Sequence, residues 1–135
     1  MKSQIRIEYL GGLRTQATHL QSKKKIITDA PIDNHGRGEA FSPTDLLATS
    51  LASCILTIIA ITLEKSNIFL QDIKAEVLKE MYPEPRKLKK ISINITIVVP
   101  IEKKYKIIIE RAAKSCPVHK SLAPELEKEI NFIYN

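Results

Sequence analysis

The chain has 135 residues, of which 44% are hydrophobic and 27% charged, and its formal net charge is +6 at pH 7. This length and composition fit a single globular domain, residues 1–135, with an ordinary hydrophobic core. The positive charge comes from scattered lysines, not from a basic stripe interleaved with aromatic residues. We therefore expect no nucleic-acid partner.

The two cysteines and the N-terminal residues bear on the compartment in which the protein works. So few cysteines favour a reducing environment over a secreted fold held together by disulfides. Residues 1–10 alternate charged and apolar side chains, which is unlike the continuous apolar segment of a signal peptide. We expect a cytoplasmic protein.

Three strands are predicted in the first part of the chain, over residues 3–10, 13–21 and 25–28. The first places Ile5, Ile7 and Tyr9 on one face, a pattern typical of a half-buried strand. The Gly11-Gly12 pair marks a hairpin turn after it. A loop rich in glycine, proline and aspartate follows over residues 29–40.

The longest apolar segment, residues 42–65, predicts a helix with Ser42 as its cap and Pro43 at its first position. Asp45 can complete a short capping box with Ser42. Residues 46–63 contain no charge, so no side of this helix is built to face water. Its length is at the lower limit for a membrane span and it carries several Ser and Thr residues, so we expect a buried core helix and no membrane partner.

The second half of the chain is predicted to contain strands over residues 71–82, 91–99 and 127–134, a helix over residues 102–115 and a short helix that begins at Pro117. Continuing the apolar stripe of the helix over 102–115 four residues past Ala112 reaches Cys116, which should therefore point toward the core. Groups of strands separated by helices predict an α+β fold with antiparallel sheets around the long apolar helix.

Cys116 is expected to cap the short helix that begins at Pro117. A cysteine at a helix N-terminus can have a lowered thiol pKa, because it meets free N–H groups and the positive end of the helix dipole. His119 lies one turn further and could add a positive charge. The alternative is a buried structural cysteine followed by a surface histidine.

Cys54 lies in the middle of the long helix and gains nothing from a helix end. If it is reactive, another segment must bring a cation to stabilise its thiolate. Arg37 is the nearest candidate in sequence and Glu39 could orient it, while Arg14 beside the Gly-Gly turn is the second choice. The alternative is a small core residue.

The sequence predicts neither a metal nor a cofactor. Zinc needs three or four ligands, and only Cys116 and His119 have ligand-like spacing. The chain lacks a Cys-x-x-Cys pair, a phosphate-binding glycine loop and a nucleophile elbow.

Two segments together resemble the OsmC / organic hydroperoxide resistance superfamily: Phe-Ser-Pro-Thr-Asp-Leu-Leu-Ala-Thr-Ser-Leu-Ala-Ser-Cys54 and Ser-Cys116-Pro-Val-His-Lys-Ser-Leu122. The resemblance covers essentially the whole chain and its order of elements. It implies an OsmC-like fold in an intertwined homodimer, in which strands of both subunits wrap two central helices.

The resemblance also implies a thiol peroxidase that reduces organic hydroperoxides in oxidative-stress defence. Cys54 would attack the peroxide, Cys116 would resolve the sulfenic acid to a disulfide, and an external dithiol such as a lipoylated protein would reduce it. Arg37 and Glu39 would form the activating pair. Thr44 stands where the better-known peroxidases carry Glu, which places the chain in a less characterised OsmC-like branch.

A second hypothesis is a non-enzymatic dimer that binds an apolar small molecule in a cavity between the central helices, with the cysteines as lining. For the enzyme, a preference for organic hydroperoxides over hydrogen peroxide is expected, because Leu51, Ile55 and Ile58 surround Cys54 on its helix.

Overall fold

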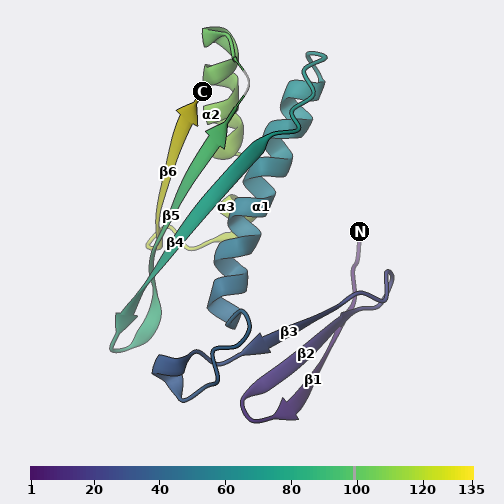
Figure 1. Ribbon diagram of the computed structural model, residues 1–135, viewed down its shortest axis with the longest axis vertical. Helices are drawn as coiled ribbons and strands as arrows, with labels where there is room; N and C mark the ends of the chain where they lie inside the picture. Colours follow the sequence, from purple (N-terminus) through teal and green to yellow (C-terminus); the bar gives the residue numbers. More distant parts are fainter. Residues whose placement is uncertain (99) are drawn as a thin grey trace. The chain divides into compact units, whose positions relative to one another are not determined.

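The computed structural model describes residues 1–98 and 100–135. The chain divides into two compact units, 1–47 and 48–135, and the boundary falls within the long helix α1, Pro43–Glu64. Each unit contains its own three-stranded sheet (Figure 1).

The sheet of the first unit is antiparallel in the order β1-β2-β3. Its strands are β1 (Ile5–Gly11), β2 (Arg14–His19) and β3 (Lys25–Asp29). These bounds confirm the three predicted strands. Gly11 and Gly12 both have positive φ, as the tight turn between β1 and β2 requires. The predicted loop after β3 contains one 3-10 turn, η1 (Ile32–Asn34).

One face of this sheet carries apolar side chains that the single chain leaves exposed. Ile7 pairs with Ala17, and Ala17 pairs with Ile26, so these three residues share one face. Ile7 is 59% exposed and Tyr9 66% exposed. The prediction of a half-buried β1 is therefore wrong for the single chain, because both faces of this strand are exposed, although Ala17 of the neighbouring strand is buried.

The sheet of the second unit has the order β4-β5-β6. Its strands are β4 (Ile73–Pro83), β5 (Arg86–Ile97) and β6 (Glu127–Tyr134). β4 and β5 are antiparallel, whereas β5 and β6 are parallel. The parallel pair corrects the expectation of purely antiparallel sheets. Its physical cause is the long connection over 98–126, which carries two helices and returns the chain in the same direction.

One strand in this unit, β5, differs from its predicted bounds. β5 begins at Arg86, five residues before the predicted start, because the hairpin with β4 extends down to the Pro83–Arg86 pair. The predicted end of this strand includes Val99, which lies outside the described residues. The predicted helices and the last strand are confirmed, as α2 (Lys103–Ala113), α3 (Pro117–Ser121) and β6.

The core of the second unit lies between the sheet and the helices (Figure 1). Four isoleucines of β5 are completely buried and alternate with polar residues, as predicted: Ile91, Ile93, Ile95 and Ile97. The helices contribute further fully buried residues: Leu51, Ile55, Ile59 and Leu63 from α1, and Ile109 and Ala113 from α2. Each large apolar side chain buried in this way stabilises the fold by about 1.5–3 kcal/mol. This packing holds the helical segments that carry Cys54 and Cys116.

Helix α1 is not buried on all sides. By length and composition it could cross a membrane, with a mean hydropathy of 2.3 over an 18-residue window of which 33% is buried. Its buried side chains belong to the core just described. A second stripe is exposed and consists of Ser50, Ser53, Thr57 and Ile61. The expectation that no side of this helix faces solvent is therefore wrong for the single chain.

Candidate active site

Cys116 lies three residues after the end of α2 and caps α3, as the sequence predicts. Its backbone is extended at φ −66° and ψ 144°, Pro117 takes the first helical position, and its Sγ accepts a hydrogen bond from the His119 N–H at 3.2 Å. The side chain is completely buried. The apolar stripe of α2 thus delivers this sulfur to the interior, as its spacing indicated.

Cys54 lies on α1 between the fully buried Leu51 and Ile55 and is itself partly exposed. Its thiol is a neighbour of that of Cys116, close enough to raise the pKa of Cys116, and both cysteines are free. Two cysteines 62 positions apart in the sequence therefore meet within the second unit. This contact is the central feature of the candidate site.

Burial raises the pKa of the Cys116 thiol, and the neighbouring Cys54 raises it further. The N–H groups of His119 and Val118 act in the opposite direction, since they stabilise the thiolate by hydrogen bonding. The helix N-terminus therefore lowers the pKa of Cys116 as expected, but burial raises this pKa by more.

The imidazole of His119 does not supply the positive charge that its position suggested. Its pKa is lowered by burial and by the charges of Lys128 and Lys114. A lowered histidine pKa leaves the ring neutral at neutral pH. His119 therefore assists Cys116 through its backbone N–H.

The first unit contains a cluster of charged residues around Asp29, which is completely buried. Arg14 donates two hydrogen bonds to its carboxylate, Nε to Oδ1 at 2.7 Å and Nη2 to Oδ2 at 2.9 Å. The Glu39 N–H also donates to Oδ2, at 3.2 Å. The hydrogen bonds from Arg14 lower the pKa of Asp29, so this carboxylate is charged at neutral pH.

Among the described residues, Glu39 is joined to Arg14 and not to Arg37. The Arg14 Nη2 and Glu39 Oε1 atoms are 3.5 Å apart. The Arg37 guanidinium lies against Gly12, where a Cβ would collide with it, and its charge contributes to the lowered pKa of Asp29. Sequence reasoning missed Asp29, because an aspartate at the start of a breaker-rich loop is typical of an ordinary turn.

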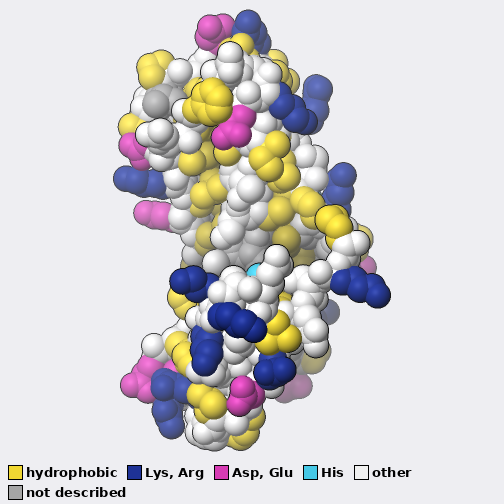
Figure 2. Space-filling model, turned by 90° about the vertical axis from the view of Figure 1, so that its right-hand side faces the viewer, with side chains coloured by type: hydrophobic (Ala, Val, Ile, Leu, Met, Phe, Trp, Pro, Cys, Tyr) yellow, Lys and Arg dark blue, Asp and Glu magenta, His cyan; other side chains and the backbone are white. Residues whose placement is uncertain are grey.

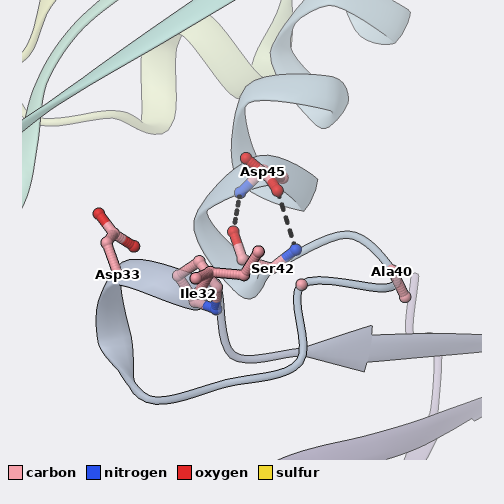
Figure 3. A pocket seen from close by; sticks show the side chains of 7 residues that line it. Ile32, Asp33, Ala40, Ser42 and Asp45 are labelled. Carbon is pink, nitrogen blue, oxygen red and sulfur yellow. Dashed lines mark hydrogen bonds between the residues drawn. The ribbon is translucent and has the colours of Figure 1, made fainter.

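The start of α1 forms the predicted capping box (Figure 3). The Asp45 N–H donates to Ser42 Oγ at 3.0 Å, and the Ser42 N–H donates to Asp45 Oδ2 at 2.9 Å. The Thr44 hydroxyl lies 3.2 Å from that of Ser42. The carboxylate nearest to Thr44 in the helix is therefore engaged in capping.

A cavity of about 450 Å³ lies beside this capping box. Figure 3 shows Ile32, Asp33 and Ala40 around it, together with the two capping residues. In the described part of the chain, no group of three His, Cys, Asp or Glu side chains converges as metal ligands.

A family model for OsmC-like proteins matches residues 36–131 of the chain. This segment contains Cys54, Cys116 and Glu39. The comparison with curated proteins gave no match.

Solved structures match almost the full length of the chain. A protein from Psychrobacter arcticus, described as a candidate osmotic stress induced and detoxification response protein, is 46% identical, with 98% of this chain and 96% of that chain covered and a TM-score of 0.93. An OsmC-like protein from Mycoplasma pneumoniae is 20% identical, with 99% and 97% covered and a TM-score of 0.84. An organic hydroperoxide resistance protein OsmC from Legionella pneumophila is 19% identical, with 98% and 97% covered and a TM-score of 0.76.

Proposed function

Because this chain belongs to the OsmC-like protein family, we propose that it is a thiol peroxidase that reduces organic hydroperoxides. The observation that carries the proposal is the contact between the two free cysteines, one partly exposed on α1 and one buried at the start of α3. The likeness to an organic hydroperoxide resistance protein supports the same chemistry.

In the proposed reaction the Cys54 thiolate attacks the terminal peroxide oxygen of ROOH. The O–O bond breaks, ROH leaves after protonation, and Cys54 becomes a sulfenic acid. The Cys116 thiolate then attacks the Cys54 sulfur, hydroxide leaves as water, and a disulfide forms. An external dithiol, for which a lipoylated protein is proposed, restores both thiols. Cys54 takes the first role because its side chain is the more accessible of the two.

The charge that activates Cys54 is proposed to come from Arg37. Arg14 is already matched by the buried Asp29 and by Glu39, whereas among the described residues no carboxylate lies within ion-pair distance of Arg37. Glu39 would then act in this cluster by holding Arg14 and Asp29 in place. Replacing Arg37 should therefore slow peroxide reduction with the fold intact, and replacing Arg14 should mainly destabilise the first unit.

The protein is further proposed to act as a cytoplasmic homodimer. The exposed apolar face of the first unit's sheet supports a second copy as its cover. Figure 2 shows hydrophobic side chains at the surface of one face, among scattered basic and acidic side chains.

Titration of free thiols before and after one equivalent of cumene hydroperoxide tests the enzymatic proposal. Loss of both thiols is expected, followed by their recovery on addition of dihydrolipoamide. Hydrogen peroxide should react more slowly than cumene hydroperoxide, because apolar residues flank Cys54. If both thiols persist after prolonged exposure, the peroxidase proposal fails and the non-enzymatic binding hypothesis takes its place.

A further inference from the structure

The two sulfurs of the site differ in exposure, and this difference bears on how the oxidised protein is reduced. Cys116 is completely buried, whereas Cys54 is partly exposed. A thiol that reduces a disulfide must approach one of its sulfurs, so access decides which one is attacked. Of the two cysteines, Cys54 alone has accessible surface in this fold, so it is the one that a thiol can approach.

The two sulfurs also differ in the hydrogen-bond donors that could stabilise each of them as a leaving thiolate. The Cys116 sulfur accepts a hydrogen bond from the His119 N–H at 3.2 Å, which stabilises a thiolate there, although burial raises the pKa of this thiol overall. This donor belongs to the backbone of the capped turn, so it is already oriented when charge develops on this sulfur. Cys54 lies mid-helix, where backbone N–H groups are engaged by the helix itself.

From these two asymmetries we infer that the external reductant attacks the disulfide at Cys54 and that Cys116 is the leaving thiolate. This inference rests on the proposed function, because it needs the Cys54–Cys116 disulfide. The thiolate RS⁻ forms a bond to the Cys54 sulfur, the Cys54–Cys116 bond breaks, and its electron pair stays on Cys116. The second thiol of the dithiol then attacks the R sulfur, releases Cys54 as a thiolate and closes the reductant's own disulfide.

Peptide mapping of the mixed disulfide tests this direction. The full-length protein is oxidised with diamide, exposed briefly to glutathione, quenched in acid, alkylated with a maleimide and digested with trypsin. Cys54 falls in the fragment 38–65 and Cys116 in the fragment 115–120, so their masses separate them. Glutathione on Cys54 with maleimide on Cys116 is expected to exceed the reverse pattern by about tenfold or more. Equal amounts of the two patterns, or an excess of the reverse, would overturn the inference.

A second measurement does not depend on trapping the intermediate. The single-cysteine variants C116S and C54S are each labelled with thionitrobenzoate through a mixed disulfide, and release of the label by glutathione is followed. Release is expected to be about tenfold faster from Cys54, and the two rates should converge in denaturant. Equal release from the folded variants contradicts the inference. A Cys116 that resists labelling under conditions that label Cys54 fully supports it.

These outcomes are independent of the peroxidase test. Diamide makes the disulfide without a peroxide, so the position of attack can be measured even if organic hydroperoxides fail to oxidise the protein. Conversely, rapid oxidation by cumene hydroperoxide together with glutathione on Cys116 would leave the proposed function standing and remove this inference alone.

Discussion

At the scale of single residues, the charged side chains of the first unit are organised around one carboxylate. Asp29 is completely buried and accepts hydrogen bonds from Arg14 and from the Glu39 backbone. A carboxylate in this position must be paired, since removing one partner from a buried ion pair leaves an uncompensated charge. The sequence displays these residues as isolated charges at a strand end and in a loop, and only the β2–β3 register brings Arg14 opposite Asp29.

Asp29 should make the stability of the protein depend on pH. Its pKa is lowered in the fold by Arg14, so its contribution is complete above the unfolded value of about 4 and is lost as pH falls through the lower folded value. The free energy of unfolding of wild type should therefore fall on acidification below about pH 4. D29N should have a lower free energy of unfolding than wild type at neutral pH. The difference between the two free energies should become smaller in acid. Urea unfolding at several pH values measures this, and a difference that does not change with pH contradicts it.

Substitution of each cysteine should give a different product with peroxide. C54S should lose peroxide reduction altogether, because the attacking sulfur is absent. C116S should react once and hold the sulfenic acid, because the resolving sulfur is absent. Dimedone labelling followed by mass spectrometry distinguishes the two variants. A C54S protein that still consumes cumene hydroperoxide would assign the attack to Cys116.

At the scale of secondary-structure elements, most of the chain could be predicted from periodicity and capping signals. The alternating isoleucines of β5 and the Ser42-to-Asp45 capping box of α1 are local patterns, and both occur as expected. The parallel direction of β6 could not be predicted in this way, because alternation is the same in both directions. It is fixed by pairs between distant residues, such as Lys90 with Glu127 at 3.1 Å and Asn94 with Asn131 at 3.0 Å.

The capping box should contribute measurably to the stability of α1. S42A removes the hydroxyl that accepts from the Asp45 N–H and should lower the free energy of unfolding by about 1 kcal/mol. S66A, in the turn after the same helix, is a matched control that should be nearly neutral. Urea denaturation followed by circular dichroism compares the two. Equal effects would show that the cap hydroxyl has no special role.

The loop between β3 and α1 depends on a close backbone approach at Gly36. A Cβ at this position would overlap the Ala30 carbonyl, and the Gly36 N–H donates to the Pro31 carbonyl at 2.9 Å. G36A should therefore destabilise the protein by about 2 kcal/mol, the cost of an overpacked site. Gly11 has positive φ but open space around it, so G11A reports backbone strain alone. A smaller loss for G36A than for G11A would argue against the steric explanation.

At the scale of the whole molecule, the single chain leaves exposed several apolar residues whose alternation in the sequence predicts burial. Ile7 and Tyr9 alternate as core residues do, yet more than half of each side chain is exposed. The α+β class and the order of elements could be read from the sequence, because each follows from local spacing, whereas the pairing of the two cysteines was implied by the family resemblance. The exposure of Ile7 and Tyr9 could not be predicted from the sequence, since it depends on which surfaces pack against β1.

The apolar face of β1 should be sensitive to charge if a second copy covers it. I7E should shift the mass measured by light scattering from dimer toward monomer at micromolar concentration, because a buried charge without a partner is costly. E8Q, on the opposite face of the same strand, should leave the mass unchanged. A wild-type protein that is folded and monomeric at this concentration would contradict the homodimer, and an unchanged I7E dimer would exclude this face from the interface.

The parallel pairing of β5 with β6 bears on the order in which the two cysteine-bearing segments fold. Such a pair forms only after the long segment between its strands has been closed into a loop, and long-range contacts of this kind are slow to form. The turn that holds Cys116 belongs to this segment. A chain still maturing is therefore expected to present Cys54 to oxidants before its resolving partner is in place. The newly made protein would then be most easily damaged by the same peroxides that the finished protein is proposed to remove.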